Sequence, residues 1–169
     1  MNVIVTGSNS GFGRRIVETL AQAGHTVFAT MRDAGGRNAK AAQELKAFGA
    51  ANGNRVHVVE LDVTKDASVA KGIDAIAKQV GGAIDVLVNN AGRFSAGVQE
   101  AFTVEEVKAL FETNVFGPLR LNRAVLPHIV HASQLGCADS RWVGYHREDS
   151  RQRRRRAGDL ACARPDRAR

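Results

Sequence analysis

Three glycines near the start of the chain follow directly on a short apolar segment, in the run Thr6-Gly-Ser-Asn-Ser-Gly-Phe-Gly13. Gly7 permits a tight turn, while Gly11 and Gly13 let backbone N–H groups approach an anion where the next helix begins. This chemistry suits the pyrophosphate of a dinucleotide. The spacing differs from the general dinucleotide fingerprint, so an ordinary strand-to-helix turn is the alternative. The apolar strand before the loop and the helix after it favour pyrophosphate binding.

Arg32 stands where the second expected strand ends, about 20 residues after the glycines, where an acidic residue would hold the ribose hydroxyls of NAD. A guanidinium at this position can pair bidentately with a 2′-phosphate. The residue type therefore favours NADP(H) over NAD(H). The alternative is that Asp33 binds the ribose and that Arg32 is a solvated turn residue.

Two further polar turns, Asp62-Val63 and Asn89-Asn-Ala-Gly92, follow the third and fourth expected strands. Ligands of open parallel sheets bind beyond the carboxyl ends of the strands, and all four turns fall at that one edge. Helix capping by Asp62 and simple turn formation by the Asn-Ala-Gly segment are the alternatives. Four such turns along one edge favour a binding site.

The elements that position these turns alternate between strand and helix periodicity. The first apolar segment is of the kind buried on both faces of a sheet, and Ile16, Val17 and Leu20 form an apolar stripe at helical spacing. The alternation predicts an α/β fold, a Rossmann-like doubly wound parallel sheet with strand order 3-2-1-4. Strands are expected at residues 2–6, 26–30, 56–61 and 84–88, and helices at about 11–23, 39–48, 67–80 and 104–126, the last interrupted by Gly117-Pro118.

The second half of such a sheet is not visible in the sequence, because clear periodicity ends after Ala132. We therefore expect a sheet truncated after its fourth strand and the following helix, with the fourth strand an apolar, unpaired edge. The predicted organisation is an incomplete NAD(P)-binding Rossmann domain over residues 1–133 and an arginine-rich tail over residues 134–169.

Together these motifs, with Asn114 in the last helix, resemble the short-chain dehydrogenase/reductase family over about residues 1–128. The resemblance implies a Rossmann fold, a nicotinamide cofactor, and hydride transfer between that cofactor and a small alcohol or carbonyl substrate. It implies that Asn114 is catalytic, organising a proton-relay water, that Asp62 and Val63 hold the adenine, and that the Asn-Ala-Gly turn lies by the cofactor's ribose. The positions implied to bind the cofactor are Gly7, Ser8, Ser10, Gly11, Phe12, Gly13, Arg32, Asp62, Val63, Asn89, Asn90, Ala91 and Gly92.

The family's chemistry also needs a serine and a Tyr-xxx-Lys pair further along the chain. The one tyrosine, Tyr145, has Asp149 four residues later, and a carboxylate there disfavours an ionised tyrosine. The last lysine is Lys108, so no Tyr-xxx-Lys pair follows Asn114. The sequence therefore predicts a short-chain dehydrogenase/reductase that is catalytically incomplete as written. A non-catalytic dinucleotide-binding module is the alternative.

Basic residues are concentrated in the tail: residues 134–169 carry 10 arginines against 5 acidic residues, whereas residues 1–133 carry 14 basic and 12 acidic residues. This lysine-free composition is typical of out-of-frame translation of a GC-rich gene, so a frameshifted or truncated family member is the leading hypothesis. If the tail is genuine, we favour a disordered segment over a segment that binds a partner. Nucleic-acid binding is least favoured, because only Trp142 and Tyr145 could stack on bases.

The remaining composition points to a cytoplasmic protein without a metal site or a membrane partner. Both cysteines, Cys137 and Cys162, lie in the tail without metal-ligand spacing, and two free thiols in a reducing cytosol are favoured over a disulfide. No segment resembles a signal peptide or a bilayer-spanning run. The helix around Asn114 lacks partners in a truncated sheet. The resemblance implies that it could be covered by a second copy in a homodimer.

Overall fold

The structure, a computed structural model, describes residues 1–129 with the exception of the Gln99 side chain. The predictions made for residues 134–169, including those for Tyr145 and both cysteines, lie outside the described residues.

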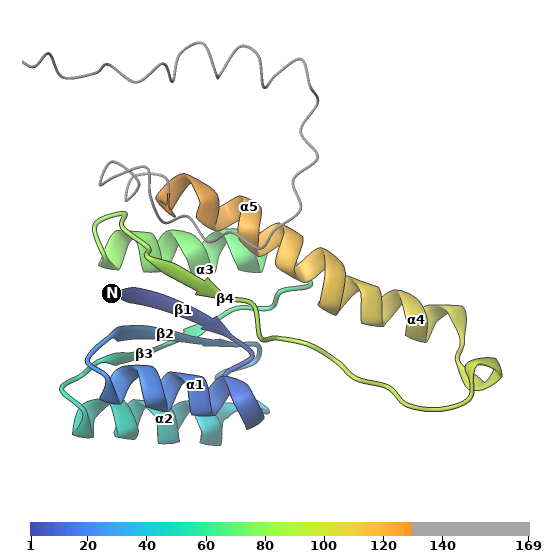
Figure 1. The fold of residues 1–169 in the computed structure, drawn as a ribbon, viewed down its shortest axis with the longest axis horizontal. Coiled ribbons are helices and arrows are strands. Elements are labelled where there is room, and N and C mark those ends of the chain that lie inside the picture. Colours follow the sequence, from blue (N-terminus) through green and yellow to red (C-terminus); the bar gives the residue numbers. More distant parts are fainter. Residues whose placement is uncertain (130–169) are drawn as a thin grey trace, which may run out of the picture. The chain divides into compact units, whose positions relative to one another are not determined.

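A four-stranded parallel sheet forms the centre of the described chain (Figure 1). Its strand order is β3-β2-β1-β4, which confirms the predicted order 3-2-1-4. In register, Val3 of β1 lies between Val27 of β2 and Val86 of β4. The strands are β1 (Asn2–Thr6), β2 (Thr26–Met31), β3 (Val56–Glu60) and β4 (Val86–Val88).

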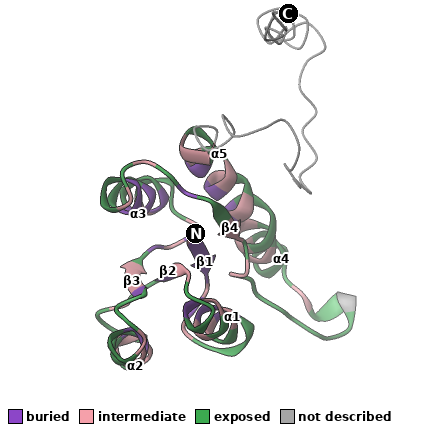
Figure 2. Ribbon diagram, turned by 60° about the vertical axis from the view of Figure 1, so that its left-hand side comes forward, coloured by how far each residue is buried: buried purple, intermediate pink, exposed green. Residues whose placement is uncertain are grey.

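Helices cover both faces of the sheet, which confirms the α/β, doubly wound arrangement (Figure 1). Helices α1 (Gly11–Gln22) and α2 (Ala39–Ala51) lie on one face, where the apolar cluster contains Val3, Val5 and Val17. Helices α3 (Asp66–Gln79) and α5 (Gly117–Ile129) lie on the other, where the cluster contains Ile4, Ile73 and Leu121. Successive residues of β1 thus face opposite layers, as strand geometry requires, and the buried stretches of the helix ribbons lie on the sides that face the sheet (Figure 2).

The last helical region consists of α4 (Val104–Phe111), a single π-helical stretch η2 (Glu112–Phe116) and α5. A capping box begins α4, in which Glu106 N donates to Thr103 Oγ1 (3.2 Å) and Thr103 N donates to Glu106 Oε2 (2.8 Å). The long helix was expected to be interrupted at Gly117-Pro118, but the irregular π-helical stretch lies in the turn before these residues. Pro118 has no N–H to donate to the Asn114 carbonyl and its ring crowds that group, so the preceding turn widens.

Strand β4 begins two residues later than expected. Ile84 is fully buried, but the Asp85 carboxylate accepts the Asn2 backbone N–H at 2.6 Å, so a side chain takes the place of a ladder bond there. Within residues 1–129, β4 pairs with β1 alone. Short 3₁₀ helix η1 (Gln99–Ala101) lies in the connection from β4 to α4.

Candidate functional site

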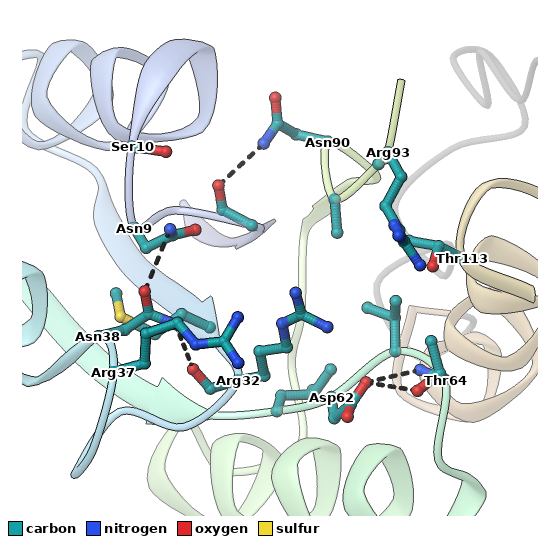
Figure 3. A pocket seen from close by; sticks show the side chains of 16 residues that line it. Asn9, Ser10, Arg32, Arg37, Asn38, Asp62, Thr64, Asn90, Arg93 and Thr113 are labelled. Atoms are coloured by element: carbon teal, nitrogen blue, oxygen red, sulfur yellow. Dashed lines mark hydrogen bonds between the residues drawn. The ribbon is translucent and has the colours of Figure 1, made fainter. Parts of the chain in front are cut away.

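A cavity of about 370 Å³ opens at the carboxyl ends of the strands, where the sequence predicted a binding site (Figure 3). All four predicted turns contribute to it. The lining residues are Gly7, Asn9, Ser10, Met31, Arg32, Arg37, Asn38, Leu61, Asp62, Val63, Thr64, Asn90, Ala91, Gly92, Arg93 and Thr113. The turns therefore converge on one cavity, as their shared position at the sheet edge requires.

The glycine loop is packed so closely that side chains are excluded from it. Gly7 has a φ of +66°, and a Cβ on it would lie 2.8 Å from the Cα of Ala91. A Cβ on Gly13 would lie 2.4 Å from the Gly7 carbonyl oxygen. Helix bonding in α1 begins with Arg14 N donating to Ser10 O (3.3 Å), so the N–H groups of Gly11, Phe12 and Gly13 lie outside the helix's own ladder. Such N–H groups form an anion-binding helix terminus.

Ser8 and Phe12 of the predicted loop do not line the cavity. The buried Ser8 hydroxyl donates to the Val5 carbonyl (2.8 Å), which makes this side chain part of the turn. Phe12 is 84% exposed and, with Gly11, lines a separate hollow beside Arg14 and Arg15. Ser10 does line the cavity, and its hydroxyl makes no capping bond to α1.

The buried hydroxyl of Thr6 joins the glycine loop to the Asn-Ala-Gly turn. It accepts the backbone N–H groups of Asn90 (3.0 Å) and Ala91 (2.9 Å) and donates to the Val88 carbonyl (3.3 Å). The Asn90 side chain donates back to the carbonyls of Thr6 (2.8 Å) and Gly7 (3.2 Å). Asn90 therefore fixes the two turns relative to each other. Its neighbour Asn89 lies outside the lining and bonds instead to Asn122 of α5 (2.9 Å).

Arg32 lines the cavity, whereas Asp33 serves the turn between β2 and α2. The Asp33 backbone has a φ of 50°, and its carboxylate accepts the Arg37 N–H at 2.9 Å. Asn38 donates to the Arg32 carbonyl (2.7 Å), which anchors the strand end. The Arg32 and Arg37 guanidinium groups join none of the ion pairs formed within residues 1–129. The geometry favours Arg32 over Asp33 as the residue that meets a ligand.

Asp62 and Val63 form the floor of the cavity beside Thr64. Asp62 Oδ1 accepts both the backbone N–H (3.0 Å) and the hydroxyl (2.7 Å) of Thr64. Partial burial opposes ionisation of Asp62, but these two bonds, with Lys65 and Arg32 nearby, lower the pKa of its carboxyl. Asp62 is therefore an ionised acceptor at the cavity wall at neutral pH.

Asn114 stands behind the cavity, and its amide holds the backbone of Arg93. Its Oδ1 accepts the Arg93 N–H at 2.8 Å, and its Nδ2 donates to the Arg93 carbonyl at 2.8 Å. The neighbouring Thr113 lines the cavity, as does the Arg93 side chain. Asn114, the predicted catalytic residue, therefore does not line the cavity itself but holds Arg93, which does.

Sequence reasoning missed six polar lining residues: Asn9, Arg37, Asn38, Thr64, Arg93 and Thr113. Two of them carried a signal. Arg37 lies in the loop after β2 and Arg93 directly follows the Asn-Ala-Gly turn, so both are cations in segments that follow strand ends. Thr113 carried none, because it comes from a helix that crosses the sheet edge from a distant part of the chain.

The charges of the cavity fit a dinucleotide that carries several phosphates. Three guanidinium groups, from Arg32, Arg37 and Arg93, line it together with a single carboxylate, that of Asp62. Gly11 and Gly13, which carry no side chains, let a pyrophosphate approach the N–H groups of α1. No group of His, Cys, Asp and Glu side chains within residues 1–129 is arranged to hold a metal ion.

Comparison with known sequences agrees with this geometry. The sequence profile described as short chain dehydrogenase matches residues 1–136. The chain therefore belongs to the short-chain dehydrogenase family.

The relatives share this part of the chain and extend well beyond it. The chain is 38% identical over 135 residues to retinol dehydrogenase 8 of Bos taurus, a match that covers 78% of the chain and 41% of the relative. It is 34% identical over 149 residues to the NADP-dependent 3-hydroxy acid dehydrogenase of Escherichia coli, covering 84% of the chain and 56% of the relative. The chain thus spans about half the length of the curated relatives it matches.

Solved structures give the same result at the level of the fold. The crystal structure of an NADPH-bound carbonyl reductase from chicken fatty liver superposes with a TM-score of 0.71 and 33% identity, over 79% of this chain and 53% of that one. A gluconate 5-dehydrogenase from Burkholderia cenocepacia, solved in complex with NADP and tartrate, gives 0.68 and 31%, over 78% and 49%. None of the helices in residues 1–129 is long and apolar enough to cross a membrane.

Proposed function

We propose that residues 1–129 are the NADP(H)-binding part of an oxidoreductase that interconverts an alcohol and a carbonyl. The observation that carries this proposal is the cavity at the strand ends, to which the glycine loop contributes Gly7, Asn9 and Ser10 beside Arg32, Asp62 and the Asn-Ala-Gly turn. Two relatives named for NADPH or NADP share this part of the chain. When bound, the nicotinamide supplies or accepts the hydride.

NADP(H) is favoured over NAD(H) by the charge at the end of β2. Arg32 lines the cavity without an ion-pair partner among the described side chains. Asp33 does not line the cavity, and its carboxylate accepts the Arg37 backbone N–H. A ribose 2′-phosphate offers the guanidinium a bidentate partner that a 2′-hydroxyl does not. We assign Arg32, assisted by Arg37, to this phosphate.

The other cofactor groups are assigned by the chemistry of the lining. Asp62 accepts a hydrogen bond from the adenine amino group and Val63 packs against the ring. The backbone of Asn90, Ala91 and Gly92 lies along a ribose. The N–H groups at the start of α1 bind the pyrophosphate.

We further propose that the 169-residue chain binds the cofactor without completing catalysis. Asn114 carries the family's proton-relay position. Its amide is occupied by Arg93, and its carbonyl lacks the regular helix bond because residue 118 is a proline. That carbonyl is the group we expect to hold a water. No Tyr-xxx-Lys pair occurs in the sequence after Asn114 to move the substrate proton. A non-catalytic dinucleotide-binding module is the second candidate.

Fluorescence titration of the purified chain with NADPH and NADH tests the binding proposal. We expect saturable binding, tighter for NADPH. Equal affinities would contradict the assignment of Arg32, and no binding of either cofactor would refute the proposed function. Carbonyl reduction, measured as NADPH oxidation with a panel of aldehydes and ketones, tests the second proposal, since turnover by the 169-residue chain would overturn catalytic incompleteness.

Besides the cofactor, we propose that a second copy of the chain binds along the α4–α5 region to form a homodimer. No residue of α4 is buried, and Phe111, Val115 and Leu119 are about half exposed on consecutive turns. An exposed apolar stripe of this kind is typical of an interface. Sedimentation equilibrium is expected to give a dimer, and Phe111→Glu a monomer, with Phe94→Glu, an exposed phenylalanine outside the stripe, as the control. A monomeric wild-type chain would refute the dimer.

A further inference from the structure

Arg93 is a cation held at the cavity wall with no role so far. It directly follows the Asn-Ala-Gly turn, its side chain is exposed, and it forms no ion pair with the described carboxylates. In the close view its side chain runs from the β4–α4 connection toward Thr113 (Figure 3). An unpaired guanidinium at this place is available for a ligand.

Asn114 restrains the direction in which the Arg93 side chain leaves the backbone. The two bonds of 2.8 Å engage the N–H and the carbonyl on either side of the Arg93 Cα. One amide side chain thus restrains both backbone dihedrals of Arg93, and with them the direction of its Cα–Cβ bond. Asn114 comes from the π-helical stretch η2, so the widened turn places the amide that performs this restraint.

The surroundings of Arg93 differ from those of the other two cavity arginines. Arg32 and Arg37 lie with Asn38 on one side, whereas Arg93 lies on the side of Thr113 (Figure 3). The lining that Arg93 and Thr113 share also contains the apolar side chains of Val63 and Ala91, and Asp62 supplies an ionised acceptor to it. A flat aromatic ring with an amino group suits this combination better than a phosphate does.

We propose that the Arg93 guanidinium stacks on the adenine ring of the bound cofactor, and that Asn114 positions Arg93 for this contact. The inference rests on the proposed function, because the adenine is part of the proposed cofactor. Guanidinium groups are planar and weakly hydrated, and they stack on aromatic faces. Arg93 is thus a cofactor-binding residue and Asn114 a positioning residue for binding.

Fluorescence titration of Arg93 variants with both cofactors tests the stacking contact. Arg93→Ala is expected to weaken NADPH and NADH binding by the same factor, roughly three- to tenfold. Arg93→Phe keeps a planar face without charge and is expected to bind within about twofold of wild type. Arg93→Lys keeps the charge without the planar face and is expected to lose as much affinity as Arg93→Ala.

Three outcomes would overturn the stacking contact. A loss confined to NADPH would assign Arg93 to the 2′-phosphate. Retention by Arg93→Lys with loss in Arg93→Phe would assign it to another phosphate. Unchanged binding by Arg93→Ala would leave it without a role. All three require that the wild-type chain binds a cofactor; failure of wild-type binding would instead refute the proposed function.

The positioning role of Asn114 is tested by a double-mutant cycle on the NADPH dissociation constant. Asn114→Ala is expected to lose affinity as Arg93→Ala does, and the double variant to lose no more than either single variant. Asn122→Ala is the matched control, because it removes a similar amide bond to the end of β4 without touching Arg93. Additive losses, or an equal loss in Asn122→Ala, would overturn the positioning role.

Discussion

Arg32 and Asp33 are adjacent residues of opposite charge at the end of β2, and the fold gives them different tasks. The Asp33 carboxylate bonds to the backbone of its own turn and does not line the cavity, whereas Arg32 does. The sequence alone left both residues open as the ribose contact, because a one-residue uncertainty in the strand end exchanges them. The structure favours Arg32 because Asp33 is absent from the cavity lining, and no residue pattern indicates that absence.

Arg32→Ala is expected to weaken NADPH binding by about ten- to hundredfold and to leave NADH binding nearly unchanged, because a charge-assisted contact to the 2′-phosphate is lost. Arg123→Ala is the matched control, since Arg123 is exposed on α5 and does not line the cavity. The measurement is the ratio of the two dissociation constants. A parallel loss for both cofactors would contradict the assignment.

The residues that sequence reasoning missed share a physical reason. Arg37 and Arg93 lie in loops and Thr113 lies in the last helical region, so the position of each at the cavity depends on tertiary folding and not on a local period. Glycines and the Asn-Ala-Gly turn were predictable, because their backbone requirements appear in their residue types. Long side chains that extend over a cavity have no such local requirement.

At the scale of elements, β1 and β2 place two buried threonines side by side with opposite consequences. Thr6 and Thr30 are register partners, and both are fully buried. The Thr6 hydroxyl makes three hydrogen bonds, whereas no described group partners the Thr30 hydroxyl. Two residues of one type at neighbouring positions therefore contribute very differently to stability.

Thr6→Val is expected to lower the free energy of unfolding by about 1–3 kcal/mol, because the Ala91 N–H loses its acceptor and the Asn90 N–H keeps only the Val88 carbonyl. Thr30→Val is expected to be neutral or to stabilise by up to about 1 kcal/mol, because it removes an unpaired buried hydroxyl. Urea denaturation measures both. A larger loss for Thr30→Val than for Thr6→Val would contradict the hydrogen-bond pattern.

The packing of α1 against the turn at β4 leads to a second prediction. Gly13→Ala would place a Cβ 2.4 Å from both the Gly7 carbonyl oxygen and Asn90 Nδ2. We expect a loss of about 2–3 kcal/mol in the free energy of unfolding, as for overpacked cores, together with weaker cofactor binding. Gly35→Ala is the control, since a Cβ there meets nothing within 4 Å, and a change within about 0.5 kcal/mol is expected. Equal thermal shifts in both variants would refute the close approach.

Element prediction from the sequence found every helix and strand of the sheet, although α2 ends three residues later than the expected helix 39–48. The expected strand 2–6 agrees with β1 at both ends, and the expected order of the strands is the observed one. The expected helix 104–126 was wrong in one detail, because the interruption begins before the proline that causes it. The expected strand 84–88 was too long, because the Asp85 side chain replaces a ladder bond. The last two differences arise from single groups rather than from periodic patterns.

At the scale of the molecule, carboxylates on separate elements share a direction of pKa shift. The Arg14 guanidinium, through a hydrogen bond, lowers the pKa of Glu44, and the backbone and hydroxyl of Thr103 lower that of Glu106. Asp62 is shifted in the same direction by Thr64, against the effect of its burial. At pH values between these lowered pKa values and the usual carboxyl pKa, the unfolded chain therefore binds more protons than the folded one.

The free energy of unfolding is expected to be constant above about pH 5 and to fall as the pH drops through these lowered pKa values. Urea denaturation at a series of pH values measures this. Glu106→Gln should flatten part of the decline, while Glu105→Gln, one residue away and outside the capping box, should not. Stability that rises on acidification would contradict the direction of all three shifts.

All of the cavity lining falls between Gly7 and Thr113, a continuous stretch of the chain. During synthesis, every group proposed to contact the cofactor therefore leaves the ribosome before Asn114, the residue that holds the Arg93 backbone. We expect a nascent chain to capture its nucleotide soon after that stage, and the bound nucleotide to stabilise what has already folded while translation continues. For the same reason, an exchange of this stretch together with Asn114 between relatives is expected to transfer nucleotide preference as one unit.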